Sequence, residues 1–155
     1  MTEPKLVGPI EVIGTGLLGT SVALAARRSG LEVLLTDVDD DHVRTATQLG
    51  AGRPRTPSDR PQLVVIAVPP AAIASVVAEA LAASDAVVTD VGSFKALIAT
   101  ELAAHPDNSR YVGSHPMAGN ERNGPLASSG ALFEGRPWAI TAHERSDVAA
   151  VALVR

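Results

Sequence analysis

The fold of this chain follows from the stretch Val12-Ile13-Gly14-Thr15-Gly16-Leu17-Leu18-Gly19 and from Asp37 downstream of it. The apolar residues before Gly14 predict a strand over 9–14, and those after Gly16 predict a helix over 17–29. The turn between them reads Gly-x-Gly-x-x-Gly, and the acid follows 21 positions after Gly16. A strand, such a turn, a helix and an acid about 20 residues further on are typical of a dinucleotide-binding unit.

The three glycines have different expected roles. Gly14 permits the tight turn, Gly16 lets the main chain approach a pyrophosphate, and Gly19 lets the helix pack closely against the strand. Leu17 and Leu18 open the helix, whose N-terminal amides favour phosphate, and are predicted to bind the cofactor together with the glycines.

Asp37 would stand at the tip of the second strand and accept hydrogen bonds from the ribose hydroxyls of adenosine. A 2′-phosphate would meet this carboxylate, and Val38 and Asp39 offer no cation for it. The predicted cofactor is therefore NAD rather than NADP. The alternative is a strand-turn-helix corner that binds no ligand.

The composition narrows the class of protein. The 155 residues predict one domain, residues 1–155, with an aliphatic core, because 46% of the residues are hydrophobic and only 3% are aromatic. A formal net charge of −4 argues against a nucleic-acid partner, which requires clustered lysines and arginines. The lack of cysteine excludes disulfides, thiolate nucleophiles and cysteine-based metal sites.

The first residues, Met1-Thr2-Glu3-Pro4-Lys5, lack the apolar core of a signal peptide. No run of residues reaches the roughly 18 apolar positions of a membrane span. We therefore expect a soluble, cytoplasmic protein without a membrane partner.

Strand-like and helix-like segments alternate along the chain. Strands are predicted over 9–14, 32–36, 63–68, 86–90, 111–114 and 137–141, and helices over 17–29, 39–49, 71–83, 94–104, 126–132 and from 146 onward. The prolines of 53–62 predict a loop. The acids Asp39–Asp41 are interpreted as helix capping rather than as a metal site, and Ser146 as an N-cap. The alternation predicts a Rossmann-like α/β fold with a doubly wound, mostly parallel sheet.

In such sheets, ligands bind beyond the carboxyl ends of the strands. Val68 and Pro69 follow one strand and are predicted to shape the cofactor pocket. Thr89-Asp90-Val91-Gly92-Ser93-Phe94-Lys95 follows the next strand, and Gly113-Ser114-His115-Pro116-Met117-Ala118-Gly119-Asn120-Glu121 follows the one after it.

Together with the glycine turn, these last two segments resemble the prephenate/arogenate dehydrogenase family, NAD(P)-dependent enzymes of tyrosine biosynthesis. Family members typically carry Asp-x-Gly-Ser-x-Lys after one strand and Gly-x-His-Pro-(Met/Ile)-Ala-Gly-x-Glu after the next. The family's x-Leu-Phe-x-Gly segment is matched by 131–135, and the resemblance extends over 9–145. It implies oxidative decarboxylation of prephenate or arogenate, a small-molecule substrate.

The resemblance also implies roles for single residues. His115 matches the catalytic histidine, a base suited to take the hydroxyl proton as hydride leaves. Ser93 matches a serine that bonds the substrate hydroxyl, orients the histidine and contacts the cofactor, although it would also serve as a helix N-cap. Lys95 either attracts the anionic substrate or is an exposed lysine.

Two loop residues complete the predicted substrate site. Gly119 is expected to let the loop pass close to the substrate. Glu121 matches a family glutamate that lines the pocket, with a plain surface charge as its alternative. The other histidines, His42, His105 and His143, are expected to be solvated.

The chain departs from the family in length. Members carry a C-terminal helical domain that dimerises and supplies an arginine for a substrate carboxylate, and no segment here matches it. We therefore expect a truncated form that binds NAD but turns over little by itself, and a homodimer for the full-length protein. Phe94 also replaces the usual small aliphatic residue.

Two further hypotheses stay open. One is another NAD(P)-dependent enzyme, a 6-phosphogluconate or β-hydroxyacid type dehydrogenase or a pyrroline-carboxylate reductase. The other is a non-catalytic nucleotide-sensing module. The choice between prephenate and arogenate is not made by this sequence.

Overall fold

The computed structural model describes residues 4–93, 95–117 and 128–155. Its centre is a parallel five-stranded sheet with the order β3-β2-β1-β4-β5. The strands are β1 (Ile10–Ile13), β2 (Val33–Thr36), β3 (Arg53–Pro54), β4 (Leu63–Ile66) and β5 (Val87–Asp90). Starting from β1, the chain adds β2 and β3 on one side of the sheet and then β4 and β5 on the other. This change of direction confirms the predicted doubly wound fold.

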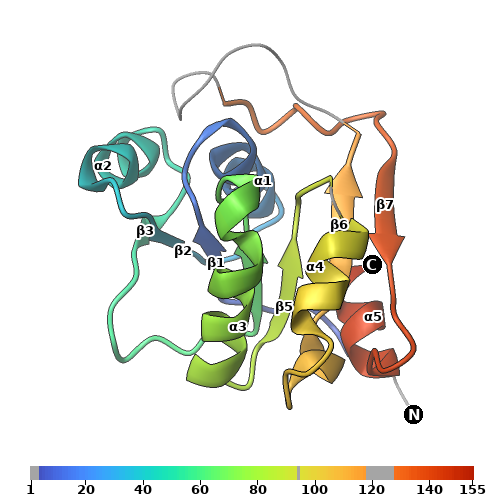
Figure 1. Ribbon diagram of the computed structural model, residues 1–155. Coiled ribbons are helices and arrows are strands. Elements are labelled where there is room, and N and C mark those ends of the chain that lie inside the picture. Colours follow the sequence, from blue (N-terminus) through green and yellow to red (C-terminus); the bar gives the residue numbers. More distant parts are fainter. Residues whose placement is uncertain (1–3, 94, 118–127) are drawn as a thin grey trace.

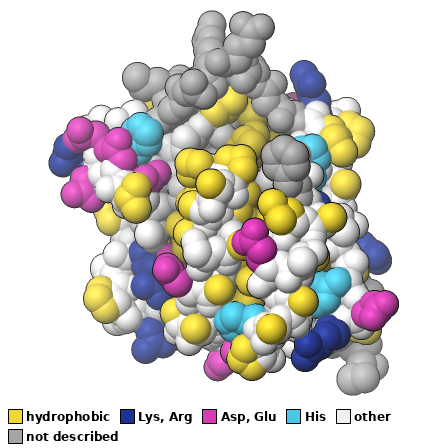
Figure 2. All heavy atoms as spheres, in the orientation of Figure 1, with side chains coloured by type: hydrophobic (Ala, Val, Ile, Leu, Met, Phe, Trp, Pro, Cys, Tyr) yellow, Lys and Arg dark blue, Asp and Glu magenta, His cyan; other side chains and the backbone are white. Residues whose placement is uncertain are grey.

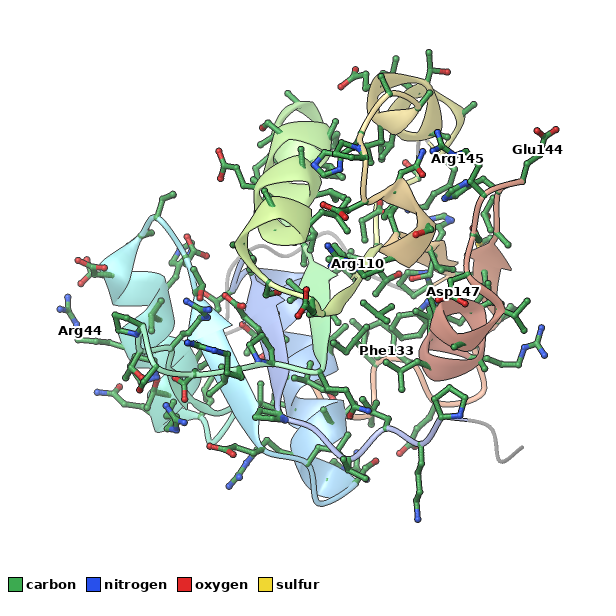
Figure 3. All side chains as sticks on the ribbon, turned by 90° about the horizontal axis from the view of Figure 1, so that it is seen from below. Arg44, Arg110, Phe133, Glu144, Arg145 and Asp147 are labelled. Atoms are coloured by element: carbon green, nitrogen blue, oxygen red, sulfur yellow. The ribbon has the colours of Figure 1, made fainter. Side chains whose placement is uncertain are left out.

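Helices cover both faces of this sheet (Figure 1). One face carries α1 (Leu17–Arg28), α2 (Asp40–Gln48) and α5 (Val148–Val154), and the other carries α3 (Ile73–Ala83) and α4 (Lys95–Leu102). The view from below shows α3 and α4 on one side of the sheet and α1 and α5 on the other (Figure 3). Two 3-10 turns, η1 (Pro70–Ala72) and η2 (Asn108–Arg110), precede α3 and β6.

Aliphatic side chains fill both layers, as the composition predicted. All four residues of β4 are buried, because helices pack on both of its faces. In the part of the chain that the structure describes, no helix is both long and apolar enough to span a bilayer.

The segment 53–62 is not entirely a loop, contrary to the prediction. Arg53 and Pro54 form the short edge strand β3, which pairs in parallel with Leu34 and Leu35 of β2. Proline lacks an N–H group, and an edge strand tolerates it because one side of its backbone needs no partner. The prolines therefore predicted a loop where two residues in fact form a strand.

The 111–114 segment does not add a full strand to the parallel sheet, which also differs from the prediction. Tyr111 forms only an isolated parallel bridge with Val88. The chain then continues as β6 (Gly113–Pro116), which pairs with the antiparallel strand β7 (Trp138–Thr141) in a separate two-stranded sheet. Pairing with β7 therefore holds β6, the strand that carries His115.

Two local predictions near the C-terminal end are wrong. The described part of 126–132 contains turns instead of a helix, with bonds such as Leu132 N–H to Ser129 O at 3.1 Å. These turns place Phe133 against the core beside α5 (Figure 3). The N-cap of α5 is Asp147, which accepts from the amide of Ala149, whereas the hydroxyl of Ser146 accepts from the amide of His143.

Candidate active site

The glycine turn has the geometry that its sequence predicts. Gly14 has a φ of 98°, and a Cβ there would lie 2.5 Å from the carbonyl oxygen of Ala67. A Cβ on Gly19 would lie 1.7 Å from the carbonyl oxygen of Gly14, so only glycine lets α1 approach the turn this closely. By contrast, no atom of the described residues lies within 4 Å of a Cβ on Gly16. The turn therefore leaves open space over its second glycine.

Asp37 bonds back to this turn. Its Oδ2 accepts from the amide of Thr15 at 2.6 Å and from the Thr15 hydroxyl at 2.9 Å, and its Oδ1 accepts from the amide of Asp39 at 2.9 Å. Burial would raise the pKa of Asp37, but these hydrogen bonds outweigh it and hold the pKa below its usual value. The carboxylate is therefore ionised and fixed at the tip of β2.

A cavity of about 1180 Å³ lies at the carboxyl ends of the strands and continues along α3. It contains most of the predicted cofactor residues: Gly14, Gly16, Leu17, Leu18, Asp37, Val68 and Pro69. Gly19 is buried behind the cavity wall and acts through packing. The space-filling view shows hydrophobic side chains over the upper part of α3 and acidic side chains over α2 (Figure 2).

The same cavity contains charged residues that sequence reasoning missed. Glu11, in the central strand β1, accepts from the Thr36 hydroxyl at 3.0 Å and lies 3.2 Å from Nε of Arg55. Burial raises the pKa of Glu11, partly offset by Thr36 and Arg55. His42 also lines the cavity, with its Nδ1 3.9 Å from Oδ2 of Asp37. No local motif marks these residues, because Arg55 and His42 reach Glu11 and Asp37 from loop 55–62 and from α2.

The acids at the start of α2 cap the helix, as predicted. Asp39 is the N-cap, and its carboxylate accepts from the amides of Asp41 and His42. Asp40 and Asp41 follow in the first turn, where negative charge is favoured by the helix dipole.

A second polar cluster lies at the end of β5, around Asp90. Its side chain is fully buried and accepts hydrogen bonds from the Tyr111 hydroxyl at 2.6 Å, from the amide of Gly92 at 2.9 Å and from Nζ of Lys95. Burial lowers the pKa of Lys95, opposed by the Asp90 carboxylate. Burial and the same carboxylate raise the pKa of Tyr111. The alternative of an exposed Lys95 is wrong, since only 14% of its side chain is accessible.

The predicted substrate residues lie apart from the large cavity. Ser93 is exposed in the turn before α4, and His115 is half-buried in β6 opposite Ala139 of β7. Neither is among the described residues that line the cavity. Gly119 and Glu121 lie outside the described residues, as does Phe94.

The prediction that the other histidines are solvated is wrong for His143. Its Nε2 lies 3.0 Å from the carbonyl oxygen of Asn108 and 3.1 Å from that of Tyr111, and its ring stacks on the Tyr111 ring. His105 also has a structural role, because its Nδ1 accepts from the amide of Asp107.

Comparison with known proteins identifies the family. A sequence profile described as "Prephenate dehydrogenase, nucleotide-binding domain" matches residues 22–155. The chain belongs to this family. The fixed aspartate described above lies within the matched residues, and the glycine turn directly precedes them.

Individual members of the prephenate dehydrogenase family agree with this assignment. The probable prephenate dehydrogenase NovF of Streptomyces niveus is 39% identical over 142 residues, 90% of this chain and 39% of that protein. The prephenate dehydrogenase of Bacillus subtilis is 31% identical over 153 residues, 92% of this chain and 41% of that protein. The chain thus spans well under two thirds of the length of these relatives.

Solved structures agree as well. The prephenate dehydrogenase of Aquifex aeolicus, in complex with hydroxyphenyl propionate and NAD+, matches with a TM-score of 0.86 and 26% identity. The match covers 99% of this chain and 56% of the other. The fold is therefore shared over almost the whole chain.

Proposed function

We propose that this chain is the NAD-binding part of an enzyme that decarboxylates prephenate oxidatively to 4-hydroxyphenylpyruvate, or arogenate to tyrosine. The observation that carries the proposal is an open glycine turn and a fixed aspartate in one cavity, in a chain of the prephenate dehydrogenase family. The two substrates differ only in a keto or amino group of the side chain, and both are candidates.

The described residues fit NAD. The open space over Gly16 admits a pyrophosphate next to the N-terminal amides of α1. Among the described residues, Oδ1 of Asp37 accepts one hydrogen bond, from the Asp39 amide, and a carboxylate oxygen can accept a second, from a ribose hydroxyl. When bound, NAD would accept the hydride.

The surroundings of Asp37 favour NAD over NADP. A 2′-phosphate would meet the carboxylates of Asp37 and Asp39 and the acidic surface of α2 (Figure 2). Arg55, a cation absent from the local sequence pattern, does line the cavity, but the Glu11 carboxylate already lies beside it, as the Asp37 carboxylate lies beside the His42 ring. Little positive charge is left for a phosphate.

His115 of β6 and Ser93 in the turn after β5 supply the proton chemistry. As the C–H electron pair leaves the ring carbon as hydride, its hydroxyl becomes a carbonyl and releases its proton to the imidazole of His115. The hydroxyl of Ser93 bonds the same oxygen and orients it. The ring carboxylate leaves as CO₂, and the electron pair of the broken C–C bond completes the aromatic ring. As the ring becomes aromatic, the carbonyl oxygen becomes a phenolate and takes a proton back from the imidazolium of His115. His115 therefore acts first as a base and then as an acid.

The test is an assay of the full-length protein for reduced nicotinamide with each substrate and with NAD or NADP. His115→Asn should lower kcat by about 10³-fold or more while NAD affinity, measured by calorimetry, stays near that of the parent. His105→Asn is a matched control, because asparagine can still accept from the Asp107 amide, and it should keep the parent rate. Full activity in His115→Asn would remove the residue from the mechanism; NAD binding without turnover of either substrate would favour a nucleotide sensor.

Other assignments stay predictions. Gly119 and Glu121 are predicted substrate contacts on the basis of the family pattern alone. The same pattern predicts Lys95 as a contact, although its ammonium is paired with the buried Asp90 carboxylate. The homodimer through a helical domain outside this chain and the cytoplasmic location are likewise predictions.

A further inference from the structure

Asp90 is the last residue of β5, and it bonds to three separate segments of the chain. Its carboxylate holds the amide of Gly92 in the turn after β5, the ammonium of Lys95 at the start of α4, and the hydroxyl of Tyr111 just before β6. Its carbonyl oxygen accepts from the Ser114 hydroxyl at 2.9 Å. These partners flank Ser93 on one side and His115 on the other.

The packing around these bonds leaves little freedom. A Cβ on Gly113 would lie 3.1 Å from Cδ of Lys95 and 3.1 Å from the hydroxyl of Tyr111, so β6 runs directly against both. The Ser114 hydroxyl also lies 3.0 Å from the Thr89 hydroxyl, and both side chains are buried. The start of β6 is thereby fixed to the end of β5 by side chains, where the parallel ladder has already ended.

We propose that Asp90 is a positioning residue of the active site, which fixes the turn carrying Ser93 relative to the strand carrying His115, and that Lys95 serves as its counterion. This inference rests on the proposed function, since the proposed function gives Ser93 and His115 their roles. Asp90 itself is fully buried and acts through its neighbours.

Charge explains why Lys95 belongs to Asp90 rather than to the substrate. A buried carboxylate is costly unless it is paired and hydrogen-bonded, and Lys95 supplies the one cation within reach of it among the described residues. The ammonium also lies 3.4 Å from the Asp90 carbonyl oxygen, on the same side. Moving the Lys95 ammonium toward a substrate anion would leave the buried Asp90 carboxylate without a cation.

A double-mutant cycle in the full-length protein tests the assignment. Asp90→Asn and Lys95→Met should each lower kcat by about tenfold or more, while the KM for substrate and the Kd for NAD change by less than about threefold. The double variant should be no slower than the slower single variant, because both changes break the same unit. If instead Lys95→Met raises KM tenfold at unchanged kcat, and the two effects multiply, Lys95 binds the substrate and the inference is wrong.

Tyr111→Phe is a milder variant in case the charged ones fold poorly. It removes one hydrogen bond from Asp90 and keeps the ring and the ion pair, so kcat should fall about two- to fivefold with NAD affinity unchanged. A parent-like kcat in Tyr111→Phe together with a parent-like kcat in Asp90→Asn would overturn the positioning role.

A measurement without turnover separates this inference from the proposed function. The imidazole resonances of His115 should shift in Asp90→Asn, whereas those of His42, which lies by Asp37, should not. If the parent enzyme oxidised neither substrate, the proposed function would fail and this comparison would still decide the positioning. Unchanged His115 resonances would contradict it.

Discussion

Two aspartates end strands of the same sheet, and their surroundings are opposite. Among the described residues, Asp37, at the end of β2, accepts hydrogen bonds from uncharged groups only, and 12% of its side chain is accessible. Asp90, at the end of β5, is inaccessible and is neutralised by Lys95. A carboxylate fixed by neutral donors keeps its charge available to a ligand, whereas a carboxylate with its own counterion is part of the framework.

The two halves of the molecule are built accordingly. The β1–α1–β2 half forms its site from residues close together in sequence: a turn, a helix start and one strand end. The β5–β6 half forms its site from side chains that meet across segments, with Asp90 and Ser114 24 positions apart. We therefore expect substitutions in the first half to destabilise the protein through backbone clashes. Substitutions in the second half should destabilise it through the loss of a charge or a hydrogen bond.

The largest effect should come from the glycine turn. Gly19→Ala puts a Cβ against the carbonyl oxygen of Gly14, so backbone must move, and the free energy of unfolding should fall by about 4 kcal/mol or more in urea titrations. Gly16→Ala is the matched control. Its Cβ meets no described residue within 4 Å and should cost about 1 kcal/mol or less, yet weaken NAD binding at least about tenfold. Equal destabilisation by both changes would contradict this account of the turn.

The next largest effect should come from the buried ion pair. Lys95→Met leaves the Asp90 carboxylate without its cation, and the free energy of unfolding at neutral pH should fall by about 3 kcal/mol. Arg44→Met breaks the ion pair with Asp41 on the outer side of α2, where both side chains are more than half exposed (Figure 3). That change should cost less than about 0.5 kcal/mol. A similar loss in both variants would mean that burial does not set the strength of the Asp90 pair.

A smaller effect should come from the hydroxyl that holds Asp37. Thr15→Val keeps the shape and removes one donor, at a cost of about 1 kcal/mol. Because the folded pKa of Asp37 lies below the unfolded value of 3.8, its stabilisation is complete above that value and is lost as the pH falls through the folded pKa. The difference between parent and variant in denaturant titrations should therefore shrink as the pH drops below about 4. A difference that is constant with pH would show that the hydroxyl does not act on the Asp37 charge.

The smallest effect should be a gain in the free energy of unfolding instead of a loss. The pKa of Glu11 is raised above 4.5 by burial, so the folded protein holds this proton more tightly, and stability falls as the pH rises through the window above 4.5. Glu11→Gln removes this titration and should gain a few tenths of a kcal/mol over the parent between about pH 4 and pH 7. A loss over that range would mean that the ion pair with Arg55 outweighs the burial of Glu11.

Local chemistry explains what could be predicted. Gly14, Gly19 and the acids of α2 act within a few residues of themselves, through φ angle, close approach and helix capping, so their sequence pattern carries the information. The strand β4 could be predicted equally well, because an uninterrupted apolar run suits a strand covered on both faces. The doubly wound fold follows from the alternation of such elements.

The tertiary structure decided the rest. Nothing near Arg55 in sequence says that it meets Glu11, and nothing near Tyr111 says that its hydroxyl bonds Asp90. Likewise, the pairing of β6 with β7 in place of the parallel sheet depends on a strand more than 20 residues away. The local sequence specifies the nucleotide-binding fold and its turn, because both depend on local backbone geometry. Which charges are paired, buried or left open to a ligand depends on contacts between distant segments, and only the folded chain decides them.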